Sequence, residues 1–338
     1  MHYVIDEFMD PVKVSVCIPT YNQAAYLEQA IRSCAAQTLK PFEIIVYDDH
    51  STDETPEILK RLADQIDNLK VFRQQENMGI SRNVDTCLRA AGGDFVVRLD
   101  SDDFLAPLYI ERLAGLLTGN PGAAYAHAMV REVDQQGRSL RQRQLARKPG
   151  FQNSTDALKS LAKGFKVAAN ILIFRRSALE KVGFIASKVN FAEDYYLVAS
   201  LAAAGYGNVY HNEILSYYRV WTDAGKVRQR RKLEEILGYR KLFEEVLEPA
   251  YARLGWSLSE LKNRRTNFAC RHMDCLDWDV YSDSEKLELK NELNKLSSSM
   301  LSKYFEWMYL NGFGKILGSY EQLKISVKDW VKKMLLRK

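Results

Sequence analysis

The chain has 338 residues, of which 46% are hydrophobic and 27% are charged, and its formal net charge is +5. This composition is typical of a globular protein, and the length predicts one large domain with an appendage. The net charge is too small to indicate a nucleic-acid partner, so none is expected. The first ten residues lack the apolar stretch of a signal peptide, and no run of about 18 apolar residues predicts a membrane span.

Five cysteines are present, and none of their spacings forms a C-x-x-C pair. The odd number and the lack of a zinc-ligand spacing favour free, reduced thiols, as in a cytoplasmic protein. The cysteines are Cys17, Cys34, Cys87, Cys270 and Cys275.

Apolar strands alternate with helical patterns along the first two thirds of the chain. The predicted strands are 12–18, 42–47, 69–72, 95–99, 123–133 and 170–174, with one or two more in 206–220. The predicted helices are 24–36, one through 58–66, 84–91, 108–117 and 191–204. This alternation predicts an α/β fold whose mostly parallel sheet is flanked by helices.

Polar motifs follow three of these strands, at the point where each strand ends. Ligands of mostly parallel sheets bind beyond the carboxyl ends of the strands, so the shared placement favours a binding site. No G-x-G-x-x-G or G-x-x-x-x-G-K-[ST] pattern occurs, which excludes a dinucleotide dehydrogenase and a P-loop enzyme. The motifs are Thr20-Tyr21-Asn22, Asp48-Asp49 and Asp100-Ser101-Asp102-Asp103.

The third motif holds three carboxylates within four residues, and these repel one another unless a cation or a proton relieves them. Mg²⁺ or Mn²⁺ carrying a diphosphate would do so, because both metals prefer oxygen ligands. A solvated acidic turn is the alternative for an isolated D-x-D pattern. An EF-hand is excluded, because Phe104 and Leu105 stand where an oxygen ligand and the turn glycine are required.

A polar basic stretch over 135–150 and a helix-rich region beyond about residue 226 follow different patterns. The stretch predicts either a mobile lid that meets phosphates or a solvated loop or hairpin. We expect two parts, a domain over 1–225 and a helical region over 226–338. The latter has amphipathic helices predicted at 232–247, 258–276 and 286–310, which would pack on the first part or form a homodimer.

The last segment, 315–338, combines an apolar stripe at helical spacing with seven basic and two acidic residues. A basic amphipathic helix that carries a tryptophan predicts contact with a membrane surface. An ordinary helix packed on the fold is the alternative.

Five motifs follow one another over about residues 12–221. They are Val14 to Asn22, Asp48 to Asp53, Asn77 to Asn83, Asp100 to Asp103, and Glu193-Asp194 with Leu197 and Gly205-Tyr206. In order and spacing they resemble the motifs of the family-2 inverting glycosyltransferases with the GT-A fold. The resemblance implies a nucleotide-diphosphate sugar donor, with a UDP-sugar favoured, and a glycan or lipid-linked saccharide as acceptor.

The resemblance also implies a role for each site residue. Asp102, with Asp100, would ligate Mn²⁺ or Mg²⁺ on the diphosphate. Asp194 would be the catalytic base, with Glu193 orienting it or binding the acceptor; alternatively, these two acids only stabilise the start of a helix. The implied nucleotide-binding residues are Pro19, Thr20, Tyr21, Asn22, Asp49, Arg82, Asp100 and Ser101.

One position departs from the family pattern. Trp221 stands where the family often has a histidine, in Tyr-Arg-x-His, as a further metal ligand. This substitution leaves a non-catalytic sugar-nucleotide-binding protein as the alternative function. A nucleotidyltransferase is disfavoured, because Pro19 to Asn22 is not a Gly-rich loop with a basic residue. The motif of processive synthases, Gln-x-x-Arg-Trp, is absent, so we expect a non-processive protein, cytoplasmic or at the inner face of the plasma membrane.

Overall fold

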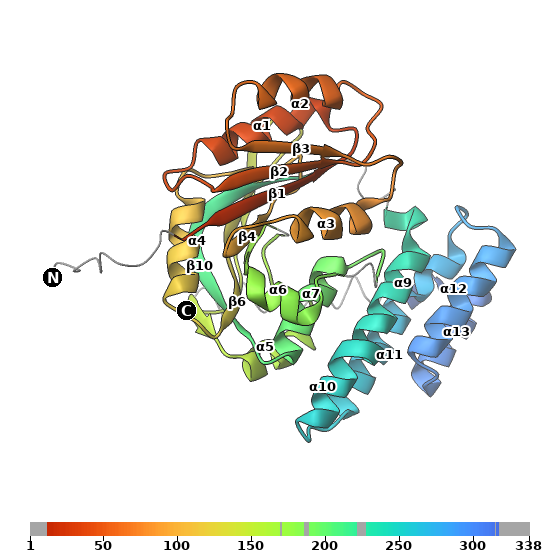
Figure 1. Ribbon diagram of the computed structural model, residues 1–338. Helices are drawn as coiled ribbons and strands as arrows, with labels where there is room; N and C mark the ends of the chain where they lie inside the picture. The colour runs from red at the N-terminus through yellow and green to blue at the C-terminus, as the bar shows by residue number, and fades with distance from the viewer. Residues whose placement is uncertain (1–11, 170, 186–188, 222–227, 315, 318–338) are drawn as a thin grey trace. The chain divides into compact units, whose positions relative to one another are not determined.

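The computed structural model describes residues 12–169, 171–185, 189–221, 228–314 and 316–317 (Figure 1). It divides into two compact units, Met1–Thr222 and Asp223–Lys338. The first unit is an α/β sheet structure and the second is helical, which confirms the predicted fold class. The basic segment predicted at 315–338 lies outside the described residues, apart from Ile316 and Leu317.

A ten-stranded, mostly parallel sheet forms the centre of the first unit. Eight strands follow the order β3-β2-β1-β4-β9-β6-β10-β5, while β7 pairs with β6 and β8 pairs with β10. Among the described strands, β9 and the short β5, β7 and β8 run antiparallel to their neighbours. The strands are β1 (Val14–Thr20), β2 (Glu43–Asp48), β3 (Leu69–Arg73), β4 (Phe95–Arg98), β5 (Phe104–Leu105), β6 (Ala123–Val133), β7 (Ser139–Arg143), β8 (Gly150–Gln152), β9 (Leu172–Arg175) and β10 (Gly207–Arg219).

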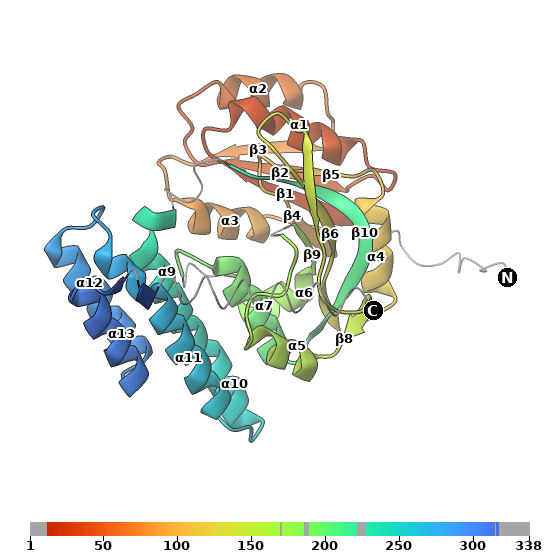
Figure 2. The same ribbon diagram turned by 180° about the vertical axis from the view of Figure 1, so that it is seen from behind.

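Helices cover the sheet, and α1 and α2 lie on one side of β1 to β3 while α3 lies on the other (Figure 2). All seven residues of β1 are buried, as expected for a strand covered on both faces. The helix α1 buries Leu27, Ile31 and Cys34, which share one face at helical spacing. The helices are α1 (Ala24–Ala35), α2 (Thr55–Ala63), α3 (Ile80–Arg89), α4 (Tyr109–Thr118), α5 (Ser154–Leu161), α6 (Arg176–Val182) and α7 (Glu193–Ala203).

The basic stretch 135–150 contains a hairpin strand, β7, which pairs with β6. Arg141 donates to the buried Glu132 at 2.6 Å, and Arg143 pairs with the same carboxylate. Arg147 donates to Asn208 at 2.6 Å. These arginines are held by contacts within the sheet, so the hairpin interpretation is favoured over a lid that meets phosphates.

The second unit is built from helices, and its longest predicted helix, 286–310, is divided in two. Ser299 caps the second piece, accepting a hydrogen bond from the backbone of Ser302, and a capping box at Ser282 begins the first. Among the described residues, no helix is long and apolar enough to cross a membrane. The elements are α9 (Lys232–Lys241), η1 (Leu242–Leu247), α10 (Glu248–Arg253), α11 (Ser259–His272), η2 (Met273–Asp277), α12 (Asp283–Leu296) and α13 (Met300–Leu310).

All five cysteines are free and buried, as the sequence predicts.

Candidate active site

A pocket of about 420 Å³ opens at the carboxyl ends of β1, β2 and β4, beside the start of α3. Because these strands are parallel neighbours, motifs far apart in sequence meet at one edge of the sheet. The lining residues are Pro19, Thr20, Tyr21, Gln23, Asp49, Asn77, Gly79, Ile80, Asn83, Asp100, Ser101 and Asp102.

Most of the nucleotide-binding residues predicted from the sequence line this pocket, but Asn22 and Arg82 do not. Asn22 has a positive φ of 51°, and its side chain accepts a hydrogen bond from the backbone of Thr52 at 2.8 Å. It therefore ties the loop after β1 to the loop after β2. Arg82 lies exposed on α3. The predicted residues on the lining are Pro19, Thr20, Tyr21, Asp49, Asp100 and Ser101.

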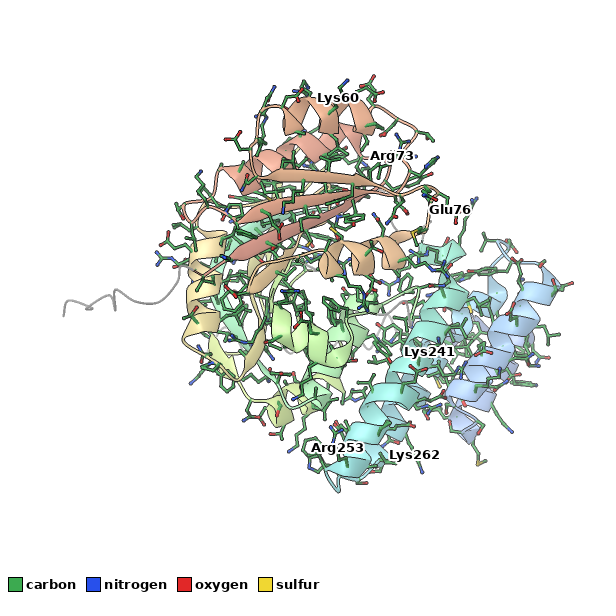
Figure 3. The ribbon with its side chains drawn as sticks, in the orientation of Figure 1. Lys60, Arg73, Glu76, Lys241, Arg253 and Lys262 are labelled. Carbon is green, nitrogen blue, oxygen red and sulfur yellow. The ribbon has the colours of Figure 1, made fainter. Side chains whose placement is uncertain are left out.

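Five lining residues carried no predicted role: Gln23, Asn77, Gly79, Ile80 and Asn83. Four of them belong to the 77–83 motif, in which a role was predicted only for Arg82. The signal that could have assigned these residues to the pocket was their place in the loop between β3 and α3. Figure 3 labels Arg73 and Glu76 just before this motif.

Asp49 holds the loop between β3 and α3 in place through hydrogen bonds. It is buried, and its two carboxylate oxygens accept hydrogen bonds from the backbone of Met78 at 2.8 Å and Gly79 at 2.9 Å. Gly79 has φ 82° and ψ 158°, a conformation open almost only to glycine. The β2 end and the α3 start are thereby joined into one wall of the pocket.

Two side chains on the β1 side are suited to meet a ligand. The hydroxyl of Thr20 is buried and has no hydrogen-bond partner among the described residues, although buried hydroxyls are usually paired. The ring of Tyr21 is 45% exposed and offers a stacking face. A planar, polar ligand such as a nucleoside matches both features.

The acidic motif, Asp100 to Asp103, lies on the β4 side of the pocket. Hydrogen bonds from the end of β10 and from Trp221 hold it in place. Arg219 donates through its backbone to Asp103 at 2.7 Å and through Nε to the carbonyl of Asp102 at 2.8 Å. Trp221 Nε1 donates to the Asp102 carboxylate at 2.6 Å. Burial, followed by the charge of Asp100, raises the pKa of Asp102 above its usual range.

Asp100 and Asp102 supply the oxygen ligands that a hard divalent cation prefers, and the charge of Asp100 adds to the effect of burial in raising the pKa of Asp102. Within the described ranges, however, no three His, Cys, Asp or Glu side chains come together to hold a metal. The two carboxylates therefore fit a cation whose other ligands come from a bound diphosphate and water.

Asp194 and Glu193 begin the helix α7. Ala192 precedes them with a positive φ of 58°, and the Asp194 side chain accepts a hydrogen bond from the backbone of Tyr195 at 2.7 Å. Burial, followed by the charge of Glu193, raises the pKa of Asp194 to about 7, while Arg98 opposes the shift. A carboxylate with this pKa is suited to accept a proton near neutral pH.

The sequence matches the family model described as "Glycosyl transferase family 2" over residues 15–183, half of its length. The chain belongs to this family. The match covers the strands β1 to β4 and the pocket that they form, and it ends before α7.

Two curated relatives match shorter segments. An "Uncharacterized glycosyltransferase" of Haemophilus influenzae is 36% identical over 107 residues, which cover 32% of this chain and 43% of the relative. A "GalNAc(5)-diNAcBac-PP-undecaprenol beta-1,3-glucosyltransferase" of Campylobacter jejuni is 42% identical over 94 residues, 28% of this chain and 30% of the relative. The chain thus spans less than half the length of either family member.

Two solved structures share the fold. S. aureus TarS 1-349 in complex with UDP-GlcNAc has a TM-score of 0.54 at 19% identity, covering 89% of this chain and 92% of that one. The mannosyltransferase PcManGT from Pyrobaculum calidifontis, in complex with GDP-Man and Mn²⁺, has a TM-score of 0.51 at 20% identity, covering 88% and 84%. Identities this low show the GT-A fold of the family and nothing finer.

Proposed function

We propose that this chain is an inverting glycosyltransferase that moves a sugar from a nucleotide-diphosphate sugar, with a UDP-sugar favoured, to a hydroxyl of a glycan or lipid-linked acceptor. The observation that carries the proposal is the pocket at the ends of β1, β2 and β4. It brings a stacking ring, an unpartnered hydroxyl and a pair of carboxylates to one place. The catalytic domain would comprise residues 1–225 and the helical region residues 226–338.

The donor would lie along the pocket, with its nucleoside on the β1 and β2 side. Tyr21 would stack on the base and Thr20 would donate or accept a hydrogen bond to it. Asp49, already held by two backbone N–H groups, has lone pairs left for the N–H of a uracil. Pro19 and Ser101 would complete the contacts. Asn22 would act indirectly, by holding the loops, and Arg82 would reach the donor only after its side chain moved.

Asp102, with Asp100, would hold Mn²⁺ or Mg²⁺ against the diphosphate. When bound, such an ion stabilises the charge that develops on the leaving diphosphate, as a Lewis acid does. Trp221 would hold the Asp102 carboxylate in place through its indole N–H. The PcManGT complex with Mn²⁺ supports this assignment by analogy of fold.

Asp194 would take the proton of the acceptor hydroxyl as that oxygen attacks the anomeric carbon. The new C–O bond would form opposite the breaking bond to the diphosphate, so the anomeric configuration would invert. Glu193 would orient Asp194 or bind the acceptor.

The acceptor would be held near a lipid surface through the second unit. Apolar side chains project from α13, where Met300 is 90% exposed and Trp307 is 53% exposed. The chain that follows, 315–338, carries seven basic and two acidic residues, which suits an anionic lipid surface. The C. jejuni relative, whose name includes PP-undecaprenol, supports a lipid-linked acceptor. The protein would then work at the inner face of the plasma membrane.

A non-catalytic sugar-nucleotide-binding protein is the second candidate, because Trp221 occupies the position of a usual metal ligand. A panel of nucleotide sugars with and without Mn²⁺ separates the two. The transferase raises its melting temperature with its donor and releases UDP or another nucleotide diphosphate. A thermal shift without release supports the binding protein. Neither effect with any nucleotide sugar contradicts both functions.

A further inference from the structure

Arg98, the last residue of β4, carries a fully buried charge between the two halves of the candidate site. Its side chain is 2% exposed, the loop after β4 brings Asp100 close to it, and α7 brings Glu193 from far along the chain. A buried guanidinium is costly unless its N–H groups are paired.

The partners of Arg98 are acids of the candidate site. Its Nε lies 3.3 Å from an Asp100 oxygen, and its Nη2 lies 3.2 Å from a Glu193 oxygen. The third nitrogen, Nη1, has no hydrogen-bond partner among the described residues. The charge of Asp194 also acts on this guanidinium. Two carboxylates thus pair with one buried cation, and Asp194 follows directly after the second of them in the chain.

Arg98 does not line the pocket, whereas Asp100 does, so Arg98 acts on the pocket through the acids that it contacts. Removing it would leave Asp100, Glu193 and Asp194 near one another with no buried counter-charge. Such a group relieves its repulsion by taking up a proton or by moving apart. Either response would disable a base that must be both ionised and in place.

We propose that Arg98 is a positioning residue, which joins Asp100 on the donor side to Glu193 on the base side and so keeps Asp194 ionised and correctly placed. This inference rests on the proposed function. It adds a physical link between donor binding and the base, carried by one side chain.

The test compares Arg98→Met and Arg98→Lys with the wild type. Arg98→Met is expected to lower turnover by about 10- to 100-fold, the usual cost of losing a supporting residue, and to move the acid limb of the pH profile upward. UDP affinity, measured by calorimetry, is expected to fall by a smaller factor than turnover, because only Asp100 of the three acids lines the pocket. Arg98→Lys keeps the charge and is expected to restore part of the turnover and return the acid limb toward its wild-type position.

A spectroscopic titration makes the test independent of turnover. With ¹³C-labelled aspartate, the Asp194 carboxyl signal, assigned by its loss in Asp194→Asn, is expected to titrate at higher pH in Arg98→Met. Arg175 offers a matched control, because this arginine of the neighbouring β9 donates to the backbone carbonyls of Ala123 and Leu117. Arg175→Lys should leave the acid limb in place.

Two outcomes would contradict the role of Arg98 without contradicting the proposed function. One is an unchanged acid limb and carboxyl titration in both Arg98 variants, and the other is equal losses of UDP affinity and turnover. If Arg98→Met does not fold, Arg98→Gln decides, because it removes the charge but keeps N–H donors for Asp100 and Glu193. A purely structural role would leave its pH profile and carboxyl titration like those of the wild type. A wild type that releases no nucleotide from any donor contradicts the proposed function instead.

Discussion

Asp194 sets the expected pH dependence of turnover. Burial and the charge of Glu193 raise its pKa to about 7, so its ionised fraction grows as pH rises through neutrality. We predict that kcat/KM falls about tenfold for each unit of pH below 7. A profile between pH 5.5 and 9 checks this, and a flat acid side would contradict the assignment of Asp194 as base.

The same shift affects stability. The folded pKa of Asp194 lies above that of an unfolded aspartate, so the protonated carboxyl favours the folded state. That contribution is lost as pH rises from the unfolded pKa through about 7. Asp194→Asn, which cannot ionise, should therefore lose less thermal stability than the wild type between pH 5 and 8.

Trp221 offers a test of the metal assignment. Its indole N–H lies 2.6 Å from Asp102, so a histidine at this position would bring an imidazole close to the proposed ion. We predict that Trp221→His lowers the Mn²⁺ concentration needed for half-maximal UDP binding by about tenfold. Trp221→Phe is the control, because it removes the hydrogen bond without adding a ligand. If both variants bind Mn²⁺ and UDP alike, position 221 does not face the metal.

Residue types at strand ends were the strongest signal in the sequence. Tyr21, Asp49 and Asp102 could be placed in one pocket, because parallel strands bring their carboxyl ends together. The network of Arg98 could not be foreseen, since a charged residue inside an apolar strand carries no sign of which distant acids it will meet. The contact between Trp221 and Asp102 depends on β10 packing beside the acidic loop, which the sequence pattern does not encode.

The loop from β3 to α3 lines the pocket, so we expect donor binding to depend on it. We predict that Gly79→Ala costs about 1–3 kcal/mol, because alanine is strained at φ 82°, and weakens UDP binding about tenfold by moving the backbone that Asp49 holds. Calorimetry with UDP measures the second effect.

Gly137→Ala is the control for strain alone, since Gly137 has a similar φ of 80° in the turn between β6 and β7 and does not line the pocket. It should lower thermal stability and leave UDP affinity unchanged. Equal UDP affinity in both variants would contradict the role given to the Gly79 loop.

The helix α13 and the chain after it carry the proposed membrane contact. Tyr304 and Phe313 are exposed beside Trp307, and the stacked rings of Trp307 and Phe313 lie 5.8 Å apart. We predict that the full chain co-sediments with vesicles containing anionic lipid, and that removal of 318–338 or the change Trp307→Gln weakens this binding several-fold, because basic and aromatic groups act together.

Leu287→Gln on α12, another exposed apolar position of this unit, should leave vesicle binding unchanged. Equal co-sedimentation of the full and shortened chains would contradict the membrane proposal. A concentration-dependent dimer that is lost with Trp307→Gln would assign this face to a second copy instead.

Element boundaries show where periodicity misleads. A single helix was predicted over 286–310 because its apolar spacing continues, yet serine side chains at 297–299 satisfy the free backbone groups and divide it. Short elements such as β5, β8 and α6 were missed because they hold too few residues to display a period. The long central strands were predicted well, since burial on both faces leaves a continuous apolar run.

At the scale of the molecule, the fold brings the side chains of the candidate site together, while substrate specificity depends on individual side chains. The family match and the sheet order account for a pocket at the strand ends, where we propose that a nucleotide sugar binds. The family model ends at residue 183, so the proposed role of the second unit rests on its helices and exposed side chains. Catalysis by Asp194 is the claim on which the whole account depends.

Turnover of Asp194→Asn, measured beside its UDP affinity, tests that claim most directly. We predict that the wild type releases UDP from its donor in the presence of Mn²⁺ and acceptor, and that Asp194→Asn loses at least about a hundredfold in rate. UDP should bind both proteins within about threefold, because Asp194 does not line the nucleotide pocket. Equal turnover by the two proteins, with UDP binding intact, would contradict the account.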